Sequence, residues 1–460
     1  MARLTVITLL VTLFKIIFSQ AADFRFVFSL TSKGITAPNS SVDMFGITWA
    51  TPGEITSSGL RMQFLTGRRN RQRYINFLSA TYEPTEIYVR SVDNNSTLMS
   101  INAQLQGLYT PPIGPTLTPW QTQHAFPTIF QNFGGYNISD PAALPGQMQV
   151  FPTHTMSPGD IQYFYLYGYD ICPPFYNVFA SNTGDSSIST YFNTFQKLYA
   201  IQIKQAYPNI DISNYVNLQN FIRTFVTGYA EGFSYLQLQN IGVDLKSLNQ
   251  SAYEFLKNDI YTYYNGDSTM YLPRLVFSSF WVDLQNWINT RITDDLNGTP
   301  SYTGFSKPKL ALYSVDDVFI GSVMKYMQNS FNWTNAELPY ATFASALNIE
   351  LTRPNGRNAY TRSDYLITIN FNDNILGPYQ ADQFMNLLSQ NFWNQYDISL
   401  YCYGMPWVVS WVFHRATIGL GVLFCFFFLA FVITIIICCC CYTRKTGNGN
   451  IAVTEDKSKI

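Results

Sequence analysis

The sequence is poor in histidine and in charged residues. Only three of its 460 residues are histidine, and 12% are charged, which is about half the share usual in a soluble domain. The formal net charge is -1, so positive charge is not in excess. Because nucleic-acid binding needs clustered positive charge, this composition argues against a nucleic-acid partner. Asn, Gln, Ser, Thr and Tyr, together with attached glycans, then have to supply the polar surface.

Cysteine is scarce through most of the chain. Cys172 and Cys402 are the only cysteines before the apolar C-terminal run, and no C-x-x-C pair or zinc-type spacing occurs there. The sequence therefore implies no metal and no cofactor. In an oxidising compartment, two such cysteines most simply form a disulfide with each other.

The N-terminus has the pattern of a secretory signal peptide. Arg3 precedes an apolar stretch from Leu4 to Phe18, and Ser19 and Ala21 satisfy the small-residue rule for cleavage. We predict a signal peptide over residues 1–21. The alternative is an uncleaved signal anchor.

The C-terminus contains a long uncharged run. The segment 416–442 exceeds the ~20 apolar residues that a helix needs to cross a bilayer. Arg444 and Lys445 follow it, as the positive-inside rule requires of a cytoplasmic flank. We predict a type I arrangement with a juxtamembrane segment 403–415, one transmembrane helix and a cytoplasmic tail 443–460.

Two kinds of covalent modification fit this arrangement. Seven N-x-S/T sequons lie between the two apolar ends and none lies in the tail, as expected of a glycosylated ectodomain. The sequon asparagines are Asn39, Asn94, Asn95, Asn137, Asn249, Asn297 and Asn332. Four cysteines at the inner membrane boundary are candidates for S-palmitoylation, the alternative being that cysteine is tolerated there as a small apolar residue. They are Cys438, Cys439, Cys440 and Cys441.

Strand and helix patterns alternate along the ectodomain. Short β-branched and aromatic runs predict strands, and apolar positions at helical spacing predict helices between them. The strands are expected at 24–30, 86–90, 309–316, 346–351 and 365–371, and the helices from Thr56 on, at 95–108 and at 380–391. Residues 187–296 have helical periodicity and few strand signals. We predict an α/β fold: a three-layer core sheet with helices on both faces, over 22–186 and 297–402, and a helical cap over 187–296.

Charged residues stand at the ends of three predicted strands. These are the loop Ser32-Lys33-Gly34, Arg90, and the pair Asp316-Asp317. In open α/β sheets, ligands bind beyond the carboxyl ends of the strands. The sequence therefore predicts one shared pocket.

Several motifs at these places resemble those of the histidine acid phosphatases, in the same order from about Phe24 to Cys402. Y-V-R-S-V-D-N-N-S-T-L-M-S, from Tyr88, is similar to the family's R-S-x-D-x-x-R-T-x-x-S element. Y-S-V-D-D-V-F, from Tyr313, is similar to its Y-S-x-H-D-x-T element. The resemblance implies the family's fold and phosphate-monoester chemistry. It also implies a bridge from Cys172 to Cys402, which are similar in placement to a family disulfide.

The residues that carry the family's chemistry are mostly replaced. The signature R-H-G-x-R-x-P has a nucleophilic His and two phosphate-binding Arg, whereas this sequence reads S-K-G-I-T-A-P from Ser32. Lys33 stands in the place of the nucleophile, and Ser32 and Thr36 stand in the places of the arginines. In the family's H-D pair, the His binds phosphate and the Asp protonates the leaving oxygen. Asp316 replaces that His, and Asp317 keeps the Asp.

Only Arg90 and Asp317 keep the family's identities among these positions. A phosphohistidine mechanism needs an imidazole that attacks phosphorus and then leaves, and a protonated lysine has no free lone pair to do so. The four charges of Lys33, Arg90, Asp316 and Asp317 sum to zero, so a phosphate dianion gains little from them. We expect an ion pair between Lys33 and Asp316 to fill the space.

The three histidines offer no replacement nucleophile. His414 is juxtamembrane, His124 lies in a loop-rich segment, and His154 falls in the family's P-x-H-T block, where a structural role is expected.

The function expected from the sequence is a type I membrane glycoprotein with an impaired phosphatase site that binds a ligand or partner at the cell surface. The alternatives are an active membrane-bound acid phosphatase and a plain coat glycoprotein. A lysosome-like compartment is the alternative location. Homodimer formation, common in the family, is left open.

Overall fold

The computed structural model forms two compact units, Met1–Asn394 and Gln395–Ile460. The residues that it describes are 23–125, 141–155, 186–263, 271–298, 308–331, 340–353, 361–390, 393, 397, 400–402, 424 and 426–436. The predicted signal peptide, the cytoplasmic tail and the palmitoylation candidates lie outside the described residues, as do Cys172, Asn137 and Asn332.

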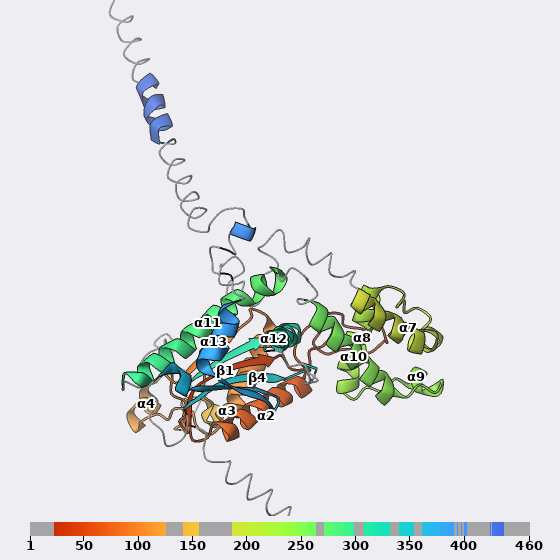
Figure 1. Ribbon diagram of the computed structural model, residues 1–460, viewed down its shortest axis with the longest axis horizontal. Coiled ribbons are helices and arrows are strands. Elements are labelled where there is room, and N and C mark those ends of the chain that lie inside the picture. The colour runs from red at the N-terminus through yellow and green to blue at the C-terminus, as the bar shows by residue number, and fades with distance from the viewer. Residues whose placement is uncertain are drawn as a thin grey trace, which may run out of the picture. The chain divides into compact units, whose positions relative to one another are not determined.

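A six-stranded mixed sheet forms the centre of the first unit, with the strand order β2-β3-β1-β4-β5-β6 (Figure 1). The strands are β1 (Asp23–Ser32), β2 (Ile87–Ser91), β3 (Leu310–Val315), β4 (Ala346–Arg353), β5 (Leu366–Phe371) and β6 (Asn374–Gln380). The pairs β2·β3 and β1·β3 are parallel, and the pairs β1·β4, β4·β5 and β5·β6 are antiparallel. The first five strands match the predicted ones to within a few residues, and β6 was not predicted.

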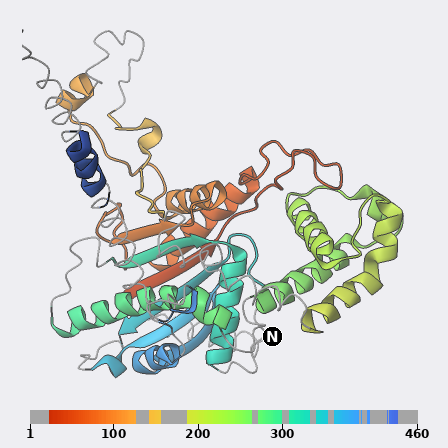
Figure 2. The same ribbon diagram turned by 90° about the horizontal axis from the view of Figure 1, so that it is seen from above.

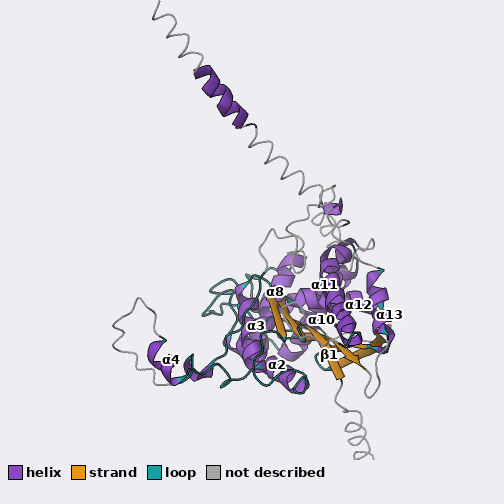
Figure 3. Ribbon diagram, turned by 90° about the vertical axis from the view of Figure 1, so that its left-hand side faces the viewer, coloured by secondary structure: helices purple, strands orange, loops and turns teal. Residues whose placement is uncertain are grey.

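Helices cover both faces of the sheet (Figure 3). One face carries α2 (Ser57–Arg73) and α3 (Asn95–Leu108), and the other carries α11 (Tyr271–Leu296), α12 (Asp317–Ser330) and α13 (Ala381–Ser389). Side chains alternate along β1 accordingly. Val27 joins a buried cluster with Tyr74, the C-cap residue of α2, and with Ile101 of α3, whereas Phe28 packs edge-on against Phe280 of α11 at 5.3 Å. The predicted mixed α/β architecture with helices on both faces is therefore present.

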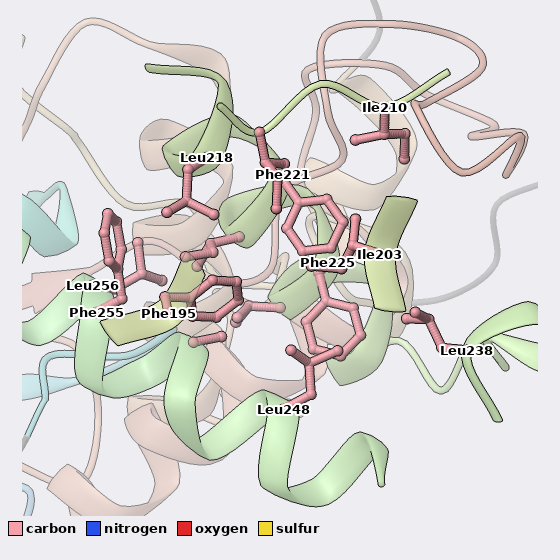
Figure 4. Close-up of a cluster of buried hydrophobic side chains, with 14 of the residues drawn as sticks. Phe195, Ile203, Ile210, Leu218, Phe221, Phe225, Leu238, Leu248, Phe255 and Leu256 are labelled. Atoms are coloured by element: carbon pink, nitrogen blue, oxygen red, sulfur yellow. The ribbon is translucent and has the colours of Figure 1, made fainter. Parts of the chain in front are cut away.

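A separate group of helices forms a cap on the core. It comprises α7 (Ser186–Ala206), α8 (Tyr215–Ala230), α9 (Leu236–Asn240) and α10 (Leu245–Tyr263). These helices enclose a hydrophobic cluster of their own, in which Phe221 and Phe225 of α8 are fully buried (Figure 4).

The cap is shorter than the sequence predicts. The prediction extends it to residue 296, but α11 packs on the sheet, where Trp287 stacks on Phe26 of β1 at 6.0 Å. Helical periodicity shows which face of a helix is buried but not what lies against it. The prediction therefore assigned α11 to the cap, although α11 packs on the sheet.

The loop after β1 joins the core to the cap. Residues 33–56 leave the sheet and extend to the cap helices before α2 begins (Figure 2). At the tip, the ring of Phe45 lies 5.2 Å from Phe221 and 4.9 Å from Tyr235 in the cap cluster. Trp49 packs edge-on against Phe233 at 5.2 Å. The loop therefore starts at the sheet, and the aromatic side chains at its tip pack on the cap.

The predicted membrane span lies largely outside the described residues. Residues 426–436 within it are helical. Over the ranges that the structure describes, no helix combines the length and the apolar character needed to cross a membrane.

Candidate functional site

The site begins where β1 ends beside β3. Ser32 is in register with Val315, and Lys33 N donates to Val315 O at 3.2 Å. Parallel pairing therefore brings Lys33 next to Asp316, although 282 residues separate them in the sequence. The turn then passes close to α2, since a Cβ on Gly34 would lie 2.5 Å from the carbonyl oxygen of Gly59. Glycine is needed at this contact, as in the family's loop.

Lys33 and Asp316 form the ion pair that the sequence analysis expects. Lys33 Nζ lies 2.9 Å from Asp316 Oδ1, and the two side chains are 27% and 21% exposed. Burial by itself would lower the pKa of Lys33, but the carboxylates of Asp316 and Asp317 outweigh it, and the pKa is raised. The amine is therefore held in its protonated form. Asp316 is also the N-cap residue of α12, and its side chain makes no cap hydrogen bond.

Asp317 lies in the first turn of α12 and contacts the cap. Arg223 Nη1 of α8 lies 3.6 Å from Asp317 Oδ2, and the hydroxyl of Tyr340 donates to the same oxygen at 3.4 Å. The family's proton donor thus has a cation and a phenol as neighbours. Any ligand that reaches Asp317 therefore has to share this carboxylate with Arg223 and Tyr340.

A second carboxylate, Asp259 of α10, lies deeper beneath the same arginine. Arg223 Nη2 is 3.9 Å from Asp259 Oδ2, and Gln219 Nε2 donates to that oxygen at 2.7 Å. The Asp259 side chain is only 3% exposed. Burial, and then the negative charge of Asp317, raise the pKa of Asp259 to about 7.

Ser32 and Thr36, at the places of the family's arginines, have local roles. Ser32 is fully buried, and its hydroxyl donates to Thr342 O at 2.7 Å and accepts from Ser345 N at 2.8 Å. Thr36 donates to Gly34 O at 3.1 Å. Neither hydroxyl hydrogen-bonds to a carboxylate or a histidine among the described residues, so no base that would activate either hydroxyl as a nucleophile is in place.

Arg90 points toward α11. Its Nη1 lies 3.5 Å from Asp283 Oδ2, and its guanidinium carbon lies 5.7 Å from the ring centroids of Tyr88 and Tyr313. Tyr313 also donates to Asp283 Oδ2, at 3.3 Å. The retained family arginine therefore has an acidic partner and two aromatic neighbours.

His154 supports strand β2. Its backbone forms a parallel bridge to Arg90, with Ser91 N donating to His154 O at 2.9 Å. Its ring stacks on Tyr88 at 5.1 Å. His124 stacks on Trp120 at 4.2 Å, in a short helix away from the sheet. His414 lies outside the described residues.

These elements enclose a pocket of about 760 Å³ between the loop after β1, α8, α10 and the segment before β4. Lys33, Thr36, Arg223 and Asp317 line it. Aromatic and polar side chains complete its wall, namely Tyr253, Tyr340, Phe343, Asn39 and Asn220. The pocket lies at two of the three predicted strand ends, those of β1 and β3, with the cap as its roof. Arg90, at the end of β2, is not among the residues that line it.

The sequence analysis missed the contribution of the cap. Arg223 follows the apolar residues Phe221 and Ile222 on α8, and no family motif or local pattern marks it. Asp283 and Asp259 lie on long helices, where a lone carboxylate usually indicates a solvent-facing position. Only the packing of the cap on the core shows that Arg223 joins Asp259 and Asp317. Asp283 belongs to α11 on the core and pairs with Arg90 instead.

Replacing Lys33 by Met should lower the free energy of unfolding by about 1–3 kcal/mol, because the half-buried Asp316 carboxylate loses its cation. Replacing Asp316 by Asn alone should also destabilise. The double variant should be more stable than the sum of the two losses predicts, by about 1 kcal/mol. Denaturant unfolding of the four proteins measures this coupling. Lys197→Met, at an exposed position on α7, is the control, and a coupling near zero would exclude the pair as a stabilising contact.

The contribution of Asp259 to stability should fall as the pH rises from about 4 to 7. The pKa of Asp259 is about 7 when folded and ~3.9 in an unfolded chain, so the unfolded state binds fewer protons in this range. Asp259→Asn should remove a part of the pH dependence on the order of 1–4 kcal/mol, since one pKa unit is worth about 1.4 kcal/mol. Melting curves across this range test it, with exposed Asp93→Asn as the control. An unchanged slope in Asp259→Asn would refute the assignment.

Comparisons with known proteins show sequence similarity to acid phosphatases. Lysosomal acid phosphatase of Rattus norvegicus is 40% identical over 77 residues, which cover 17% of this chain and 16% of that protein. Prostatic acid phosphatase of Mus musculus is 29% identical over 160 residues, covering 34% and 35%. The chain thus matches about a sixth to a third of the length of these relatives.

Among solved structures, the phytase from Citrobacter braakii superposes with a TM-score of 0.54 over 81% of this chain and 98% of that chain, at 11% identity. This likeness concerns the fold alone. The family model of the histidine phosphatase superfamily (branch 2) matches residues 38–372, a range that begins at the last residue of the altered signature loop. With well over half of its length matched and the sheet, the cap and the pocket in place, the chain belongs to the histidine phosphatase superfamily, branch 2.

Proposed function

We propose that this protein is a catalytically inactive, membrane-anchored member of the superfamily, whose pocket binds a ligand or a partner at the cell surface. One observation carries the proposal. The amine of Lys33, the residue that the motif resemblance aligns with the nucleophilic histidine, lies 2.9 Å from Asp316. With its pKa raised, the amine has no lone pair for attack on phosphorus.

The charges in the pocket support the same conclusion. Phosphoryl transfer depends on cations that stabilise the equatorial oxygens. Each cation that lines this pocket already faces a carboxylate, as Lys33 faces Asp316 and Arg223 faces Asp317. A phosphate dianion would have to compete with these carboxylates. The pocket thus favours ligands without a high negative charge.

The place of the family's first arginine gives further support. Ser32 is fully buried, and its hydroxyl is bonded to two backbone groups near β4. An arginine side chain at this position would have to leave that site and turn into the pocket. The loop is therefore adapted to a small residue, and the pocket lacks the cation that an arginine would supply.

Two observations support secretion and a membrane anchor. Cys402 is disulfide-bonded, which is typical of proteins that fold in an oxidising compartment, and Cys172 remains its proposed partner. In the helical residues 426–436, Phe428 and Ile433 are more than half exposed, as expected of a lipid-facing surface. The cell surface is the proposed location. Relatives named lysosomal acid phosphatases make a lysosome-like compartment the alternative.

An active acid phosphatase is the second candidate. Asp317 keeps the identity of the family's proton donor and lines the pocket, and Arg90 keeps that of a phosphate ligand. For such an enzyme, Arg90 would have to exchange Asp283 for phosphate. A nucleophile other than histidine would also have to act.

The purified full-length protein should not hydrolyse a generic aryl phosphate at any pH from about 4 to 8. An active enzyme with an essential acid and an essential base would instead show a bell-shaped dependence of the rate on pH. The expected rate equals that of the Asp317→Ala variant, because the wild type lacks a nucleophile. Release of the aryl alcohol is followed by absorbance. Turnover that disappears in Asp317→Ala would establish the active phosphatase instead.

A further inference from the structure

One predicted glycosylation site lies on the rim of the pocket. Asn39 and Ser40 both line the pocket and are both exposed. With Ser41 they form an N-S-S sequon, in which the asparagine amide can accept an N-glycan. The same asparagine is therefore open to solvent on one side and borders the pocket on the other.

Hydrogen bonds on both sides of Asn39 hold the rim in place. Ala37 N donates to Glu54 O at 2.9 Å, and Gly53 N donates to Pro38 O at 3.0 Å. Beyond the sequon, Trp49 N donates to Ser41 O at 2.9 Å. The segment therefore folds back on itself, and a group attached to Asn39 would start from a fixed point at the mouth of the pocket.

Apolar side chains near the sequon are left uncovered. Val42 and Met44 also line the pocket, and they are 50% and 39% exposed. A bulky, solubilising glycan on Asn39 would cover these two side chains.

The other described sequons lie elsewhere. Asn94 caps α3 by accepting from Ser96 N at 2.9 Å, and Asn95 donates to Glu54 Oε1 at 2.7 Å. Asn297 follows the end of α11, and Asn249 lies within α10. Of the sequon asparagines in the described part of the chain, Asn39 alone lines the pocket. Among the described sequons, only Asn39 can therefore place a glycan at the mouth of the pocket.

We propose that Asn39 carries an N-glycan that stands over the mouth of the pocket, so that small ligands enter freely and large ones are excluded. The amide nitrogen bonds to the anomeric carbon of an oligosaccharide, and the bond from that carbon to the diphosphate of a lipid carrier breaks. The amide loses one proton, and no electrons are transferred. The disulfide at Cys402 fits the lumenal compartment in which this reaction occurs. The inference holds whether or not the pocket is catalytic.

The test uses the full chain expressed in a secretory eukaryotic host. Glycopeptide mass spectrometry measures the occupancy of Asn39. Thr224→Cys on α8 then places a thiol in the pocket wall, and its labelling by N-ethylmaleimide is compared with labelling by a maleimide joined to a long polyethylene glycol. Peptide mapping separates this thiol from the native cysteines. Thr36→Cys is a second reporter in case the first does not fold.

We expect Asn39 to be occupied. Asn39→Gln should raise the rate of labelling by the large reagent several-fold and leave labelling by the small reagent unchanged. Enzymatic removal of the glycan from the otherwise unaltered reporter protein should have the same effect, and Asn297→Gln should have none. An unoccupied Asn39, or a large-reagent rate that does not change when the glycan is absent, would overturn the proposal.

Discussion

The parallel pairing of β1 with β3 is the constraint on which the site depends. It places the residues after the two strands side by side, so whatever follows Ser32 meets whatever follows Val315. In this protein those residues are Lys33 and Asp316, 2.9 Å apart. Two opposite charges that share a half-buried space stabilise each other, and each would be costly to leave alone. The strand pairing that gives the family a phosphate site therefore gives this chain an internal ion pair.

The cap adds a second set of paired charges above the first. Arg223 lies between Asp317 of the core and Asp259 of the cap. Because the loop after β1 also inserts Phe45 into the cap cluster, the cap and the core are joined by both apolar and charged contacts. The resulting pocket has aromatic and amide groups on its wall and cations whose charge is already balanced. These features are the basis for proposing that the pocket binds a weakly charged ligand.

The sheet and its flanking helices could be predicted because their local signals agree with the fold. Five strands have β-branched or aromatic runs bounded by turn residues, and α3 has as its N-cap Asn94, a residue type that favours this position. Strand β6 was missed because its exposed edge sequence contains Gly377 and Pro378, which are typical of loops. The role of α11 was misjudged because a periodic pattern does not identify the packing partner.

At the site, the strand ends and the motif order predicted Lys33, Asp316 and Asp317 as neighbours, and the structure brings them together. Arg90 was expected to face the same pocket, but it lies against Asp283 and two tyrosines. The sequence could not show this, because the acidic partner comes from a helix about 190 residues away in the chain. Arg223 was missed for the same reason. Contacts between distant elements determine which charges are free to bind a ligand, and these contacts have no local signal.

The most direct test of the central claim is the affinity for inorganic phosphate, measured by isothermal titration calorimetry on the full-length protein in detergent at mildly acidic pH. If the cations of the pocket are already paired, no saturable binding should appear up to millimolar phosphate, where the available binding energy is only about 4 kcal/mol. Saturable binding in the micromolar range that is lost in Arg90→Ala would contradict the account, because it would show that the ion pairs open for a phosphate dianion.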